Sequence, residues 1–397
     1  YFIWYTWNEN NWYSLTPSNN FPVTASGETL RTSNGIADHE NANFGKHVAI
    51  SGDGNWIAVG QDNFTPDGGR VYMYRKWANT MKFAGIVTDS SGISFGGALD
   101  LNYDGSRLIV ADASGSRVHV YDMDITFRSV GYDVWQYTDY SYSLNATFSD
   151  DHGDGYATSV EISRDGNSII IGYPTANSGR GAVRVFTYDA SSPADANMAS
   201  ANYGPVGWKI KGQNPIYGVS TTSSIGLHAH SLAINRDGTV IAFGSAGDNA
   251  IWVYQYDDST STWVSKGTQD GDYLFHNSLF SGGDGLGTNV SLDNSGNLVS
   301  FGFKDANDLS GNVKNGAVAV FQYDATKTNK VIYQPGTSQA DSLNFGPIGW
   351  RLLGSDLHFQ SSNAQNSDGE FGALATAISG DGTTVIGGDP HYVSNLA

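Results

Sequence analysis

Short apolar runs that alternate with polar residues recur along this chain, and they meet at the same kind of turn. The turn is Asp-Gly, or Ser-Gly in one copy, and the copies read VAISGDGNWIAVG, LDLNYDGSRLIVA, VEISRDGNSIIIG, LAINRDGTVIAFG, VSLDNSGNLVSFG and TAISGDGTTVIGG. Asp-Gly between alternating apolar runs indicates a β-hairpin. The pattern therefore predicts a series of similar hairpins. Each hairpin ends on a small residue: Gly60, Ala111, Gly172, Gly244, Gly302 and Gly388.

Two further strands are expected after most hairpins. An aromatic alternating segment comes first, as in RVYMY, AVRVFTY and AVAVFQY, and a segment that often carries Trp follows it, with Trp208, Trp263 and Trp350. Four strands per repeated unit are typical of a β-propeller blade. We therefore predict an all-β propeller as a single domain over residues 1–397, with six four-stranded blades and seven as the alternative. The expected blades are approximately 1–15 with 372–397, 44–85, 95–148, 156–213, 228–268 and 286–355.

The two ends of the chain predict how the ring closes. Residues 1–15 read as two strands without a hairpin before them, and the last hairpin has no third strand after it. We expect residues 1–15 to pair with the strands that residues 372–393 begin, because closure removes exposed sheet edges. The alternative is that the chain continues beyond Ala397. Two insertions, 189–206 and 324–348, end in the near copies NYGPVGWKIKG and NFGPIGWRLLG, and the second leaves room for a degenerate seventh blade.

Charge and composition narrow the functional classes. The formal net charge is −18 with a pI near 4.6, and such a surface repels phosphate backbones and anionic membranes. Nucleic acid is therefore not an expected partner. The chain has no cysteine, which excludes disulfides and thiolate chemistry. It also has no apolar run of the length that spans a membrane.

The repeats resemble the FG-GAP class of propeller repeats, found in integrin α-subunit heads and in many secreted or surface proteins. Phe44-Gly45, Phe95-Gly96 and Phe371-Gly372 begin three units, and GYP at 172–174 resembles the GAP element. Tyr156-Ala157 and Leu286-Gly287 read as degenerate versions. A variant of this repeat in microbial, algal and viral surface proteins is more similar still. The resemblance implies a propeller outside the cell or on a particle surface, and it says little about function.

Calcium is the cofactor that the resemblance raises, although no cofactor is certain. Calcium-binding FG-GAP repeats carry several Asp and Asn at alternate positions, whereas each hairpin turn here has essentially one Asp, which turn chemistry explains. The segment DDHGDG is the best calcium candidate, with Asp150, Asp151 and Asp154 as ligands. Acidic residues before other first strands, Asp38, Glu40, Asp284, Asp368 and Glu370, form either a cation site at one mouth of the ring or a solvated rim. His228 and His230 could share a strand face, but no further zinc ligand is visible.

Three sequons bear on a secreted location. Asn145 and Asn63 are the candidate glycosylation sites, and Asn289 falls in a predicted inner strand, where it should be inaccessible. Loop aromatics suit protein interfaces or sugar stacking, and packing against a blade edge explains them equally well. They are Trp12, Tyr13, Tyr137, Tyr140, Tyr142, Tyr217 and Tyr333.

The functional prediction is a non-enzymatic extracellular propeller, serving as a structural or interaction module of a surface, fibre or coat assembly. Its expected partners are other protein chains, copies of itself, or glycans. No G-x-S-x-G, HExxH or Walker-type motif is present, so we predict no enzyme. The first alternative is a carbohydrate- or ligand-binding, lectin-like propeller. The second is a glycosidase-like enzyme, which needs two carboxylates about 5–10 Å apart at the channel mouth.

Overall fold

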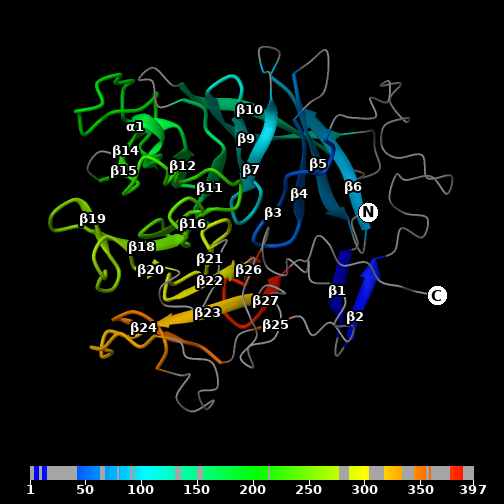
Figure 1. Cartoon of the computed structure of the whole chain (residues 1–397). Coiled ribbons are helices and arrows are strands. Elements are labelled where there is room, and N and C mark those ends of the chain that lie inside the picture. The colour runs from blue at the N-terminus through cyan, green and yellow to red at the C-terminus, as the bar shows by residue number, and fades with distance from the viewer. Residues whose placement is uncertain are drawn as a thin grey trace.

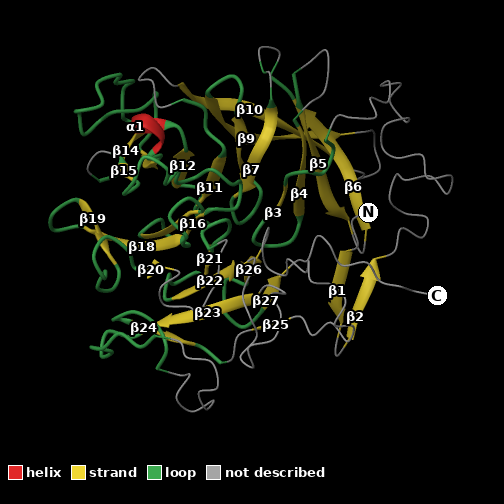
Figure 2. Ribbon diagram, in the orientation of Figure 1, coloured by secondary structure: helices red, strands yellow, loops and turns green. Residues whose placement is uncertain are grey.

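The computed structural model of the chain describes residues 4–8, 11–15, 43–62, 68–77, 80–89, 92, 94–129, 136–149, 155–212, 215–276, 286–303, 317–332, 344–354, 357–358 and 376–387. Within these residues the secondary structure is almost entirely β-strand (Figure 2). One short helical segment, α1 (Ala176–Gly179), interrupts the strands. No helix of the described part is long and apolar enough to cross a membrane.

Blades 1 and 2 are antiparallel four-stranded sheets whose strands follow chain order. Blade 1 consists of β3 (Val48–Ile50), β4 (Trp56–Gln61), β5 (Arg70–Trp77) and β6 (Thr80–Val87). Blade 2 consists of β7 (Phe95–Leu101), β8 (Arg107–Asp112), β9 (Arg117–Ser129) and β10 (Gln136–Ser149).

Blades 3, 4 and 5 each carry a two-residue fifth strand, which pairs with the third strand beyond the end of the fourth. Blade 3 has β11 (Ser159–Ile162), β12 (Ser168–Tyr173), β13 (Ala182–Tyr188), β14 (Trp208–Ile210) and β15 (Ile216–Tyr217). Blade 4 has β16 (Leu232–Ile234), β17 (Val240–Ser245), β18 (Ala250–Asp257), β19 (Thr262–Ser265) and β20 (Phe275–His276). Blade 5 has β21 (Ser291–Leu292), β22 (Leu298–Phe303), β23 (Ala317–Tyr323), β24 (Trp350–Leu352) and β25 (Leu357–His358).

The chain ends hold two separate two-stranded sheets. Blade 6 begins with β26 (Thr376–Ile378) and β27 (Val385–Gly387), and near the N-terminus β1 (Trp4–Asn8) pairs with β2 (Asn11–Leu15). No strand pairing joins these two sheets within the described residues. Ring closure by the N-terminal strands therefore stays a prediction.

The innermost strands β3, β7, β11, β16, β21 and β26 contact one another in that order and surround a common centre (Figure 1). We call this centre the ring axis. Sheets arranged radially around an axis, each starting at its innermost strand, define a β-propeller. The prediction of an all-β propeller is confirmed.

Strand alternation explains why the second strands are apolar along most of their length. In β12, Ile169 and Ile171 pack with residues of blade 2, whereas Ile170, on the opposite face, packs with residues of blade 4. All three are fully buried. A strand that is covered on both faces reads as a continuous apolar run, because side chains alternate between the faces. The hydrophobic core therefore lies between neighbouring blades.

The hairpin turns are held by their own side chains, as turn chemistry predicts. In the first turn the Asp53 carboxylate accepts hydrogen bonds from the Ser51 hydroxyl at 2.6 Å and from the Asn55 N–H at 2.9 Å. The Ser51 hydroxyl in turn accepts from the Trp56 N–H at 2.9 Å. The same pattern recurs around Asp165 and Asp381. These carboxylates are therefore engaged in turn geometry.

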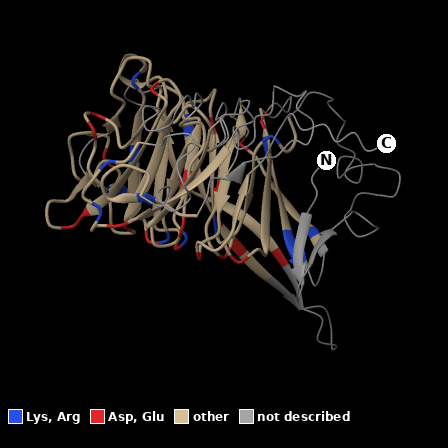
Figure 3. Cartoon of the chain, turned by 60° about the horizontal axis from the view of Figure 1, so that its bottom comes forward, with Lys and Arg blue, Asp and Glu red and all other residues tan. Residues whose placement is uncertain are grey.

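Charged side chains lie mostly in loops and turns, where both signs are interleaved (Figure 3). Apolar side chains occupy the strands because these are covered by neighbouring sheets. Among the residues that the structure describes, the acidic side chains therefore lie largely outside the strand core.

Candidate functional site

Most of the acidic residues singled out from the sequence lie outside the described residues. These are Asp150, Asp151 and Asp154 of the calcium candidate, Asp38, Glu40, Asp284, Asp368 and Glu370 of the expected acidic mouth, and the sequon residue Asn63. Across the described ranges, no three or more His, Asp or Glu side chains are grouped so that they could hold a metal ion. Calcium binding stays a prediction.

Asn145 lies at the junction of blades 2 and 3. Its amide nitrogen donates to Asp122 at 2.6 Å, and its amide oxygen accepts from the Trp208 indole at 3.0 Å. Glycosylation at Asn145 stays a prediction, and it would have to replace the bond to Asp122. Asn289 is fully buried, as expected, and its amide oxygen accepts from the Gly302 N–H and the Thr376 hydroxyl.

The strongest chemical constellation was not singled out from the sequence, and it lies at the ring axis. Asp100 and Glu161 occupy the same position in the innermost strands of blades 2 and 3, within LDLNYDG and VEISRDG. Their carboxyl groups are joined by a hydrogen bond. One Asp100 oxygen also accepts from the Ile162 N–H at 3.0 Å, and the other accepts from the Leu101 N–H at 2.7 Å.

Strand pairing places this pair at the axis. An innermost strand is paired on one edge only, so the N–H groups on its other edge point toward the ring centre. The Ile162 N–H is one of these groups, and its acceptor is Asp100. Blade 5 repeats the arrangement, because the Ser291 hydroxyl accepts from the Ile378 N–H of blade 6 at 3.2 Å. In blades 2 and 5, a polar side chain at this strand position therefore accepts an N–H of the next innermost strand.

The ring axis is filled at the end where the hairpin turns meet. The Arg164 guanidinium of blade 3 lies 3.8 Å from the ring centroid of Tyr103 in blade 2 and donates to the Asn294 amide oxygen of blade 5 at 3.0 Å. Neighbouring turns also bond through their backbones, as from the Tyr103 N–H to the Arg164 carbonyl at 2.9 Å. Access to the carboxylate pair is therefore expected from the opposite end.

The surroundings of Asp100 and Glu161 raise the pKa values of both carboxyl groups, which favours a proton shared by the pair. Burial raises the pKa of Asp100 to about 6, against hydrogen bonds from Ile162, Leu101 and Glu161 that lower it. Burial and the neighbouring Asp100 charge raise the pKa of Glu161 well above its usual range. Both residues are half-buried, so part of each remains accessible to water. We therefore expect the pair to keep one proton where an exposed pair would be fully ionised, and we assign that proton to Glu161 because the Asp100 charge raises the pKa of Glu161.

The sequence does carry a signal for this pair. The position of Asp100 and Glu161 is Ala49, Ala233, Ser291 and Ala377 in the other repeats. Two acids at a position otherwise reserved for small residues stand out once the repeats are aligned. What the alignment does not show is that two consecutive blades bring these side chains into contact.

Three histidines have pKa values shifted downward, the opposite direction to those of the carboxyl pair. The pKa of His47 is lowered to about 4, first by burial and then by the positive charges of Lys46 and His230. Burial also lowers the pKa values of His228 and His230. His228 and His230 fall in no metal-ligating group of the described residues.

Stability is expected to decrease as the pH rises and the carboxyl pair loses its protons, and to decrease as the pH falls from 6.5 toward 4 and His47 gains one; between about pH 4 and 6 the Asp100 and His47 contributions oppose each other. The stabilising contribution of protonated Asp100 is complete below its unfolded pKa of 3.8 and is lost as the pH rises through its folded pKa of about 6. Glu161, whose pKa is also raised, contributes with the same sign. His47 contributes above its unfolded pKa of 6.5, and this is lost as the pH falls toward its folded pKa of about 4.

Urea unfolding between pH 4 and pH 9 measures these two limbs. We expect Glu161→Gln to flatten the alkaline limb and to leave the acid limb in place, whereas His47→Asn should do the reverse. An alkaline limb that is unchanged in both Glu161→Gln and Asp100→Asn would show that the pair does not hold the proton.

Comparisons with known proteins support the architecture alone. No protein-family model and no curated protein matches the chain. The chain is similar to the solved periplasmic gluconolactonase PpgL of Pseudomonas aeruginosa, with 15% identity, a TM-score of 0.45, and coverage of 89% of this chain and 79% of that one. It is also similar to the β-propeller domain of Cps50 (Swd1) from Myceliophteria thermophila, with 13% identity, a TM-score of 0.45, and coverage of 87% of this chain and 80% of that one. A Bacteroides fragilis protein named provisionally as a 6-phosphogluconolactonase is 17% identical, with a TM-score of 0.41 and coverage of 88% of this chain and 78% of that one.

These similarities correct one prediction and leave others open. The prediction of a non-enzymatic structural or interaction module is wrong. The solved propellers that this chain is similar to include proteins named as gluconolactonases. These similar structures are propellers of other kinds than the FG-GAP class. The resemblance to FG-GAP repeats therefore stays a prediction. The extracellular location and the expected partners likewise stay predictions.

Proposed function

We propose that this chain is a hydrolase-type enzyme that uses Asp100 and Glu161 as an acid–base pair. The observation that carries the proposal is the hydrogen-bonded carboxyl pair contributed by neighbouring innermost strands. Two carboxyl groups in contact share a proton, because both cannot be ionised at such a separation. One ionised and one protonated carboxyl group are the components of general acid–base catalysis.

The contact distance argues for water activation rather than for the glycosidase geometry. Glycosidases separate their carboxyl groups by roughly 5–10 Å, which leaves room for a sugar or a water molecule between them. Asp100 and Glu161 are instead in direct hydrogen-bond contact. The glycosidase-like alternative predicted the wider spacing, and the pair does not match it.

The chemistry follows from the protonation states. The Asp100 carboxylate accepts a proton from water while the water oxygen forms its bond to the substrate carbon. Glu161 donates its proton to the oxygen that leaves when its bond to that carbon breaks. Transfer of the new Asp100 proton to the Glu161 carboxylate, across their hydrogen bond, restores the starting state.

Hydrolysis of defined probes tests this proposal. Because the pair does not select a substrate, the panel covers three bond classes: p-nitrophenyl esters, p-nitrophenyl glycosides and simple lactones. We expect turnover of at least one class, with a rate that rises as Asp100 ionises near pH 6. Asp100→Asn and Glu161→Gln should each lower kcat by about a hundredfold or more.

Ser291→Ala is the matched control. Ser291 occupies the position of Asp100 in blade 5 and makes the same kind of contact to the next innermost strand, but it carries no titrating group. Its variant should keep full activity. No turnover of any class, or activity that survives in both carboxyl variants, would exclude the pair as the catalytic group.

A further inference from the structure

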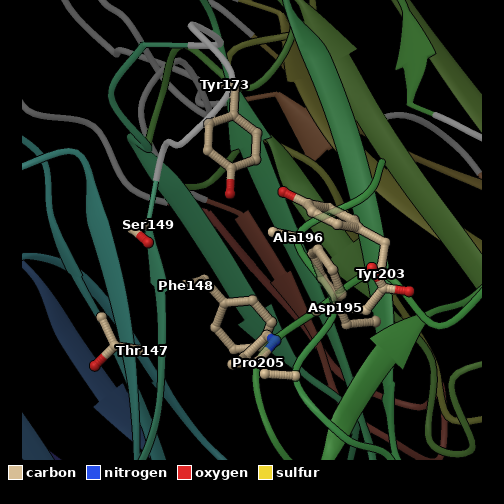
Figure 4. A pocket seen from close by; sticks show the side chains of 11 residues that line it. Thr147, Phe148, Ser149, Tyr173, Asp195, Ala196, Tyr203 and Pro205 are labelled. Carbon is tan, nitrogen blue, oxygen red and sulfur yellow. The ribbon is translucent and has the colours of Figure 1, made fainter. Parts of the chain in front are cut away.

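A cavity of about 220 Å³ lies away from the ring axis, between the outer strand β10 of blade 2 and the segment that joins β13 to β14 in blade 3 (Figure 4). Its lining combines aromatic rings with hydroxyl and carboxylate groups. The lining residues that matter here are Phe148, Tyr173, Phe186, Asp195, Ala196 and Tyr203. At this volume it holds one small ring rather than a drug-sized ligand, whose sites are about 300–1,000 Å³.

Strand alternation determines which side chains of β10 enter the cavity. Phe148 points toward blade 3, where its ring centroid lies 4.7 Å from that of Phe186 and 5.9 Å from that of Trp208. Thr147 points to the other face, and its hydroxyl lies 3.1 Å from the His119 Nδ1. Phe148 and Phe186 therefore form an apolar base.

Two tyrosines provide the polar part of the cavity. Figure 4 shows Tyr173 and Tyr203 entering from different elements with their hydroxyl ends directed toward the same space. Tyr203 also packs on Phe186, with ring centroids 5.9 Å apart. The cavity thus offers aromatic faces next to hydrogen-bonding hydroxyls.

The wall that carries Tyr203 is held in place by the backbone. Asp195 and Gly204 exchange two N–H to carbonyl hydrogen bonds, each of 2.9 Å, which close the segment between them into a loop. The Asp195 carboxylate accepts from the Asn197 N–H at 2.8 Å. A wall that is already ordered costs little conformational entropy when a ligand binds.

Charge near the cavity disfavours an ion as the occupant. The buried Arg184 guanidinium lies 5.8 Å and 5.5 Å from the ring centroids of Tyr173 and Tyr203. Arg184 and the Asp195 carboxylate at the lining carry opposite charges, so neither a cation nor an anion is attracted by both groups. A wholly apolar ligand would form no hydrogen bond with the tyrosine hydroxyls or the Asp195 carboxylate at the lining, so a ligand that carries hydroxyl groups matches this lining better.

We propose that this cavity binds one neutral sugar ring, either free or at the end of a glycan. The C–H face of a pyranose packs on aromatic rings, and its hydroxyls bond to the tyrosine hydroxyls and to Asp195. This site is separate from the carboxylate pair and does not depend on the hydrolase proposal.

Saturation-transfer NMR on the full chain tests the proposal, with methyl glucopyranoside, methyl galactopyranoside and methyl mannopyranoside as probes. We expect transfer to the ring protons of at least one of them. Tyr203→Leu removes one aromatic face and should weaken binding by about tenfold. Ala196→Trp fills the cavity from an exposed lining position and should abolish transfer without removing a buried group.

Two controls separate this site from other surfaces. Tyr217→Ala removes an exposed tyrosine of the same blade that does not line the cavity, and it should leave transfer unchanged. Asp100→Asn should also leave it unchanged. Absence of transfer from all three sugars, transfer that survives in Ala196→Trp, or transfer lost in Asp100→Asn would each overturn the proposal. A glycan that ends in the bound sugar distinguishes the two forms of the ligand. If the site accepts glycan ends, transfer should be confined to the terminal ring of that glycan, and if the site takes only the free sugar, the glycan should show no transfer.

Discussion

Trp350→Ala is expected to lower the free energy of unfolding by about 3–5 kcal/mol, as measured by urea unfolding. Trp350 has no exposed surface and lies in the core between blades 4 and 5. Its ring centroid lies 5.8 Å from that of Phe275 and 5.4 Å from that of Tyr323. Its indole N–H donates to the Lys266 carbonyl of blade 4. Truncation opens a cavity and leaves that carbonyl without its partner.

Trp263→Ala is the matched control for this effect. Trp263 is the corresponding residue of blade 4, and its indole donates to the Lys211 carbonyl of blade 3 at 2.8 Å, but the side chain is only half-buried. The two variants lose the same kind of hydrogen bond and differ in buried area. We expect Trp263→Ala to cost less than half as much. Equal losses would show that the hydrogen bond, and not the packing, carries the stability.

Gly244→Ala is expected to destabilise the fold by about 3 kcal/mol, although it adds a single methyl group. A Cβ at Gly244 would lie 2.3 Å from the Gly287 carbonyl oxygen and 2.7 Å from its Cα. Both obstacles are backbone atoms of the next blade, which cannot move aside as a flexible side chain can. Relief of the clash therefore requires blades 4 and 5 to separate, and urea unfolding should report the loss.

Gly271→Ala separates this clash from the ordinary cost of replacing a glycine. Gly271 has a φ of +66°, and a Cβ added there would meet no atom within 4 Å. Alanine at this position therefore bears only the cost of the left-handed backbone, about 1–2 kcal/mol. If Gly271→Ala costs as much as Gly244→Ala, the close approach of the two blades is not what requires glycine at position 244.

The glycines show how far sequence reasoning reaches. The repeat alignment predicts a small residue at Gly60, Gly172 and Gly244, but it offers no reason for it. In the structure these residues lie against Gly96, Gly226 and Gly287 of the following blades. Gly96 and Gly287 belong to the Phe-Gly and Leu-Gly pairs expected at the start of a unit. The blade 4 counterpart is Ile225-Gly226, which the Phe-Gly pattern does not reveal.

The short fifth strands β15, β20 and β25 were also absent from the prediction of four-stranded blades. Two residues are too few to show an alternating pattern, and their pairing depends on where the chain returns to the third strand. By contrast, the Trp-bearing fourth strands β14, β19 and β24 were expected, because each presents a recognisable run after the aromatic strand.

Local patterns alone determined the all-β class, the hairpins, their turn chemistry and the repeated blade of this protein. Each of these depends on residues within a few positions of one another, so the periodicity of side chains and the conformational freedom of Asp-Gly are enough to specify them. The tertiary structure decided the rest. Asp100 and Glu161 meet, Arg164 reaches Asn294, and Phe148 faces Tyr203, because neighbouring and distant blades converge in space. Contacts between residues so far apart depend on how whole sheets pack, which no local pattern encodes.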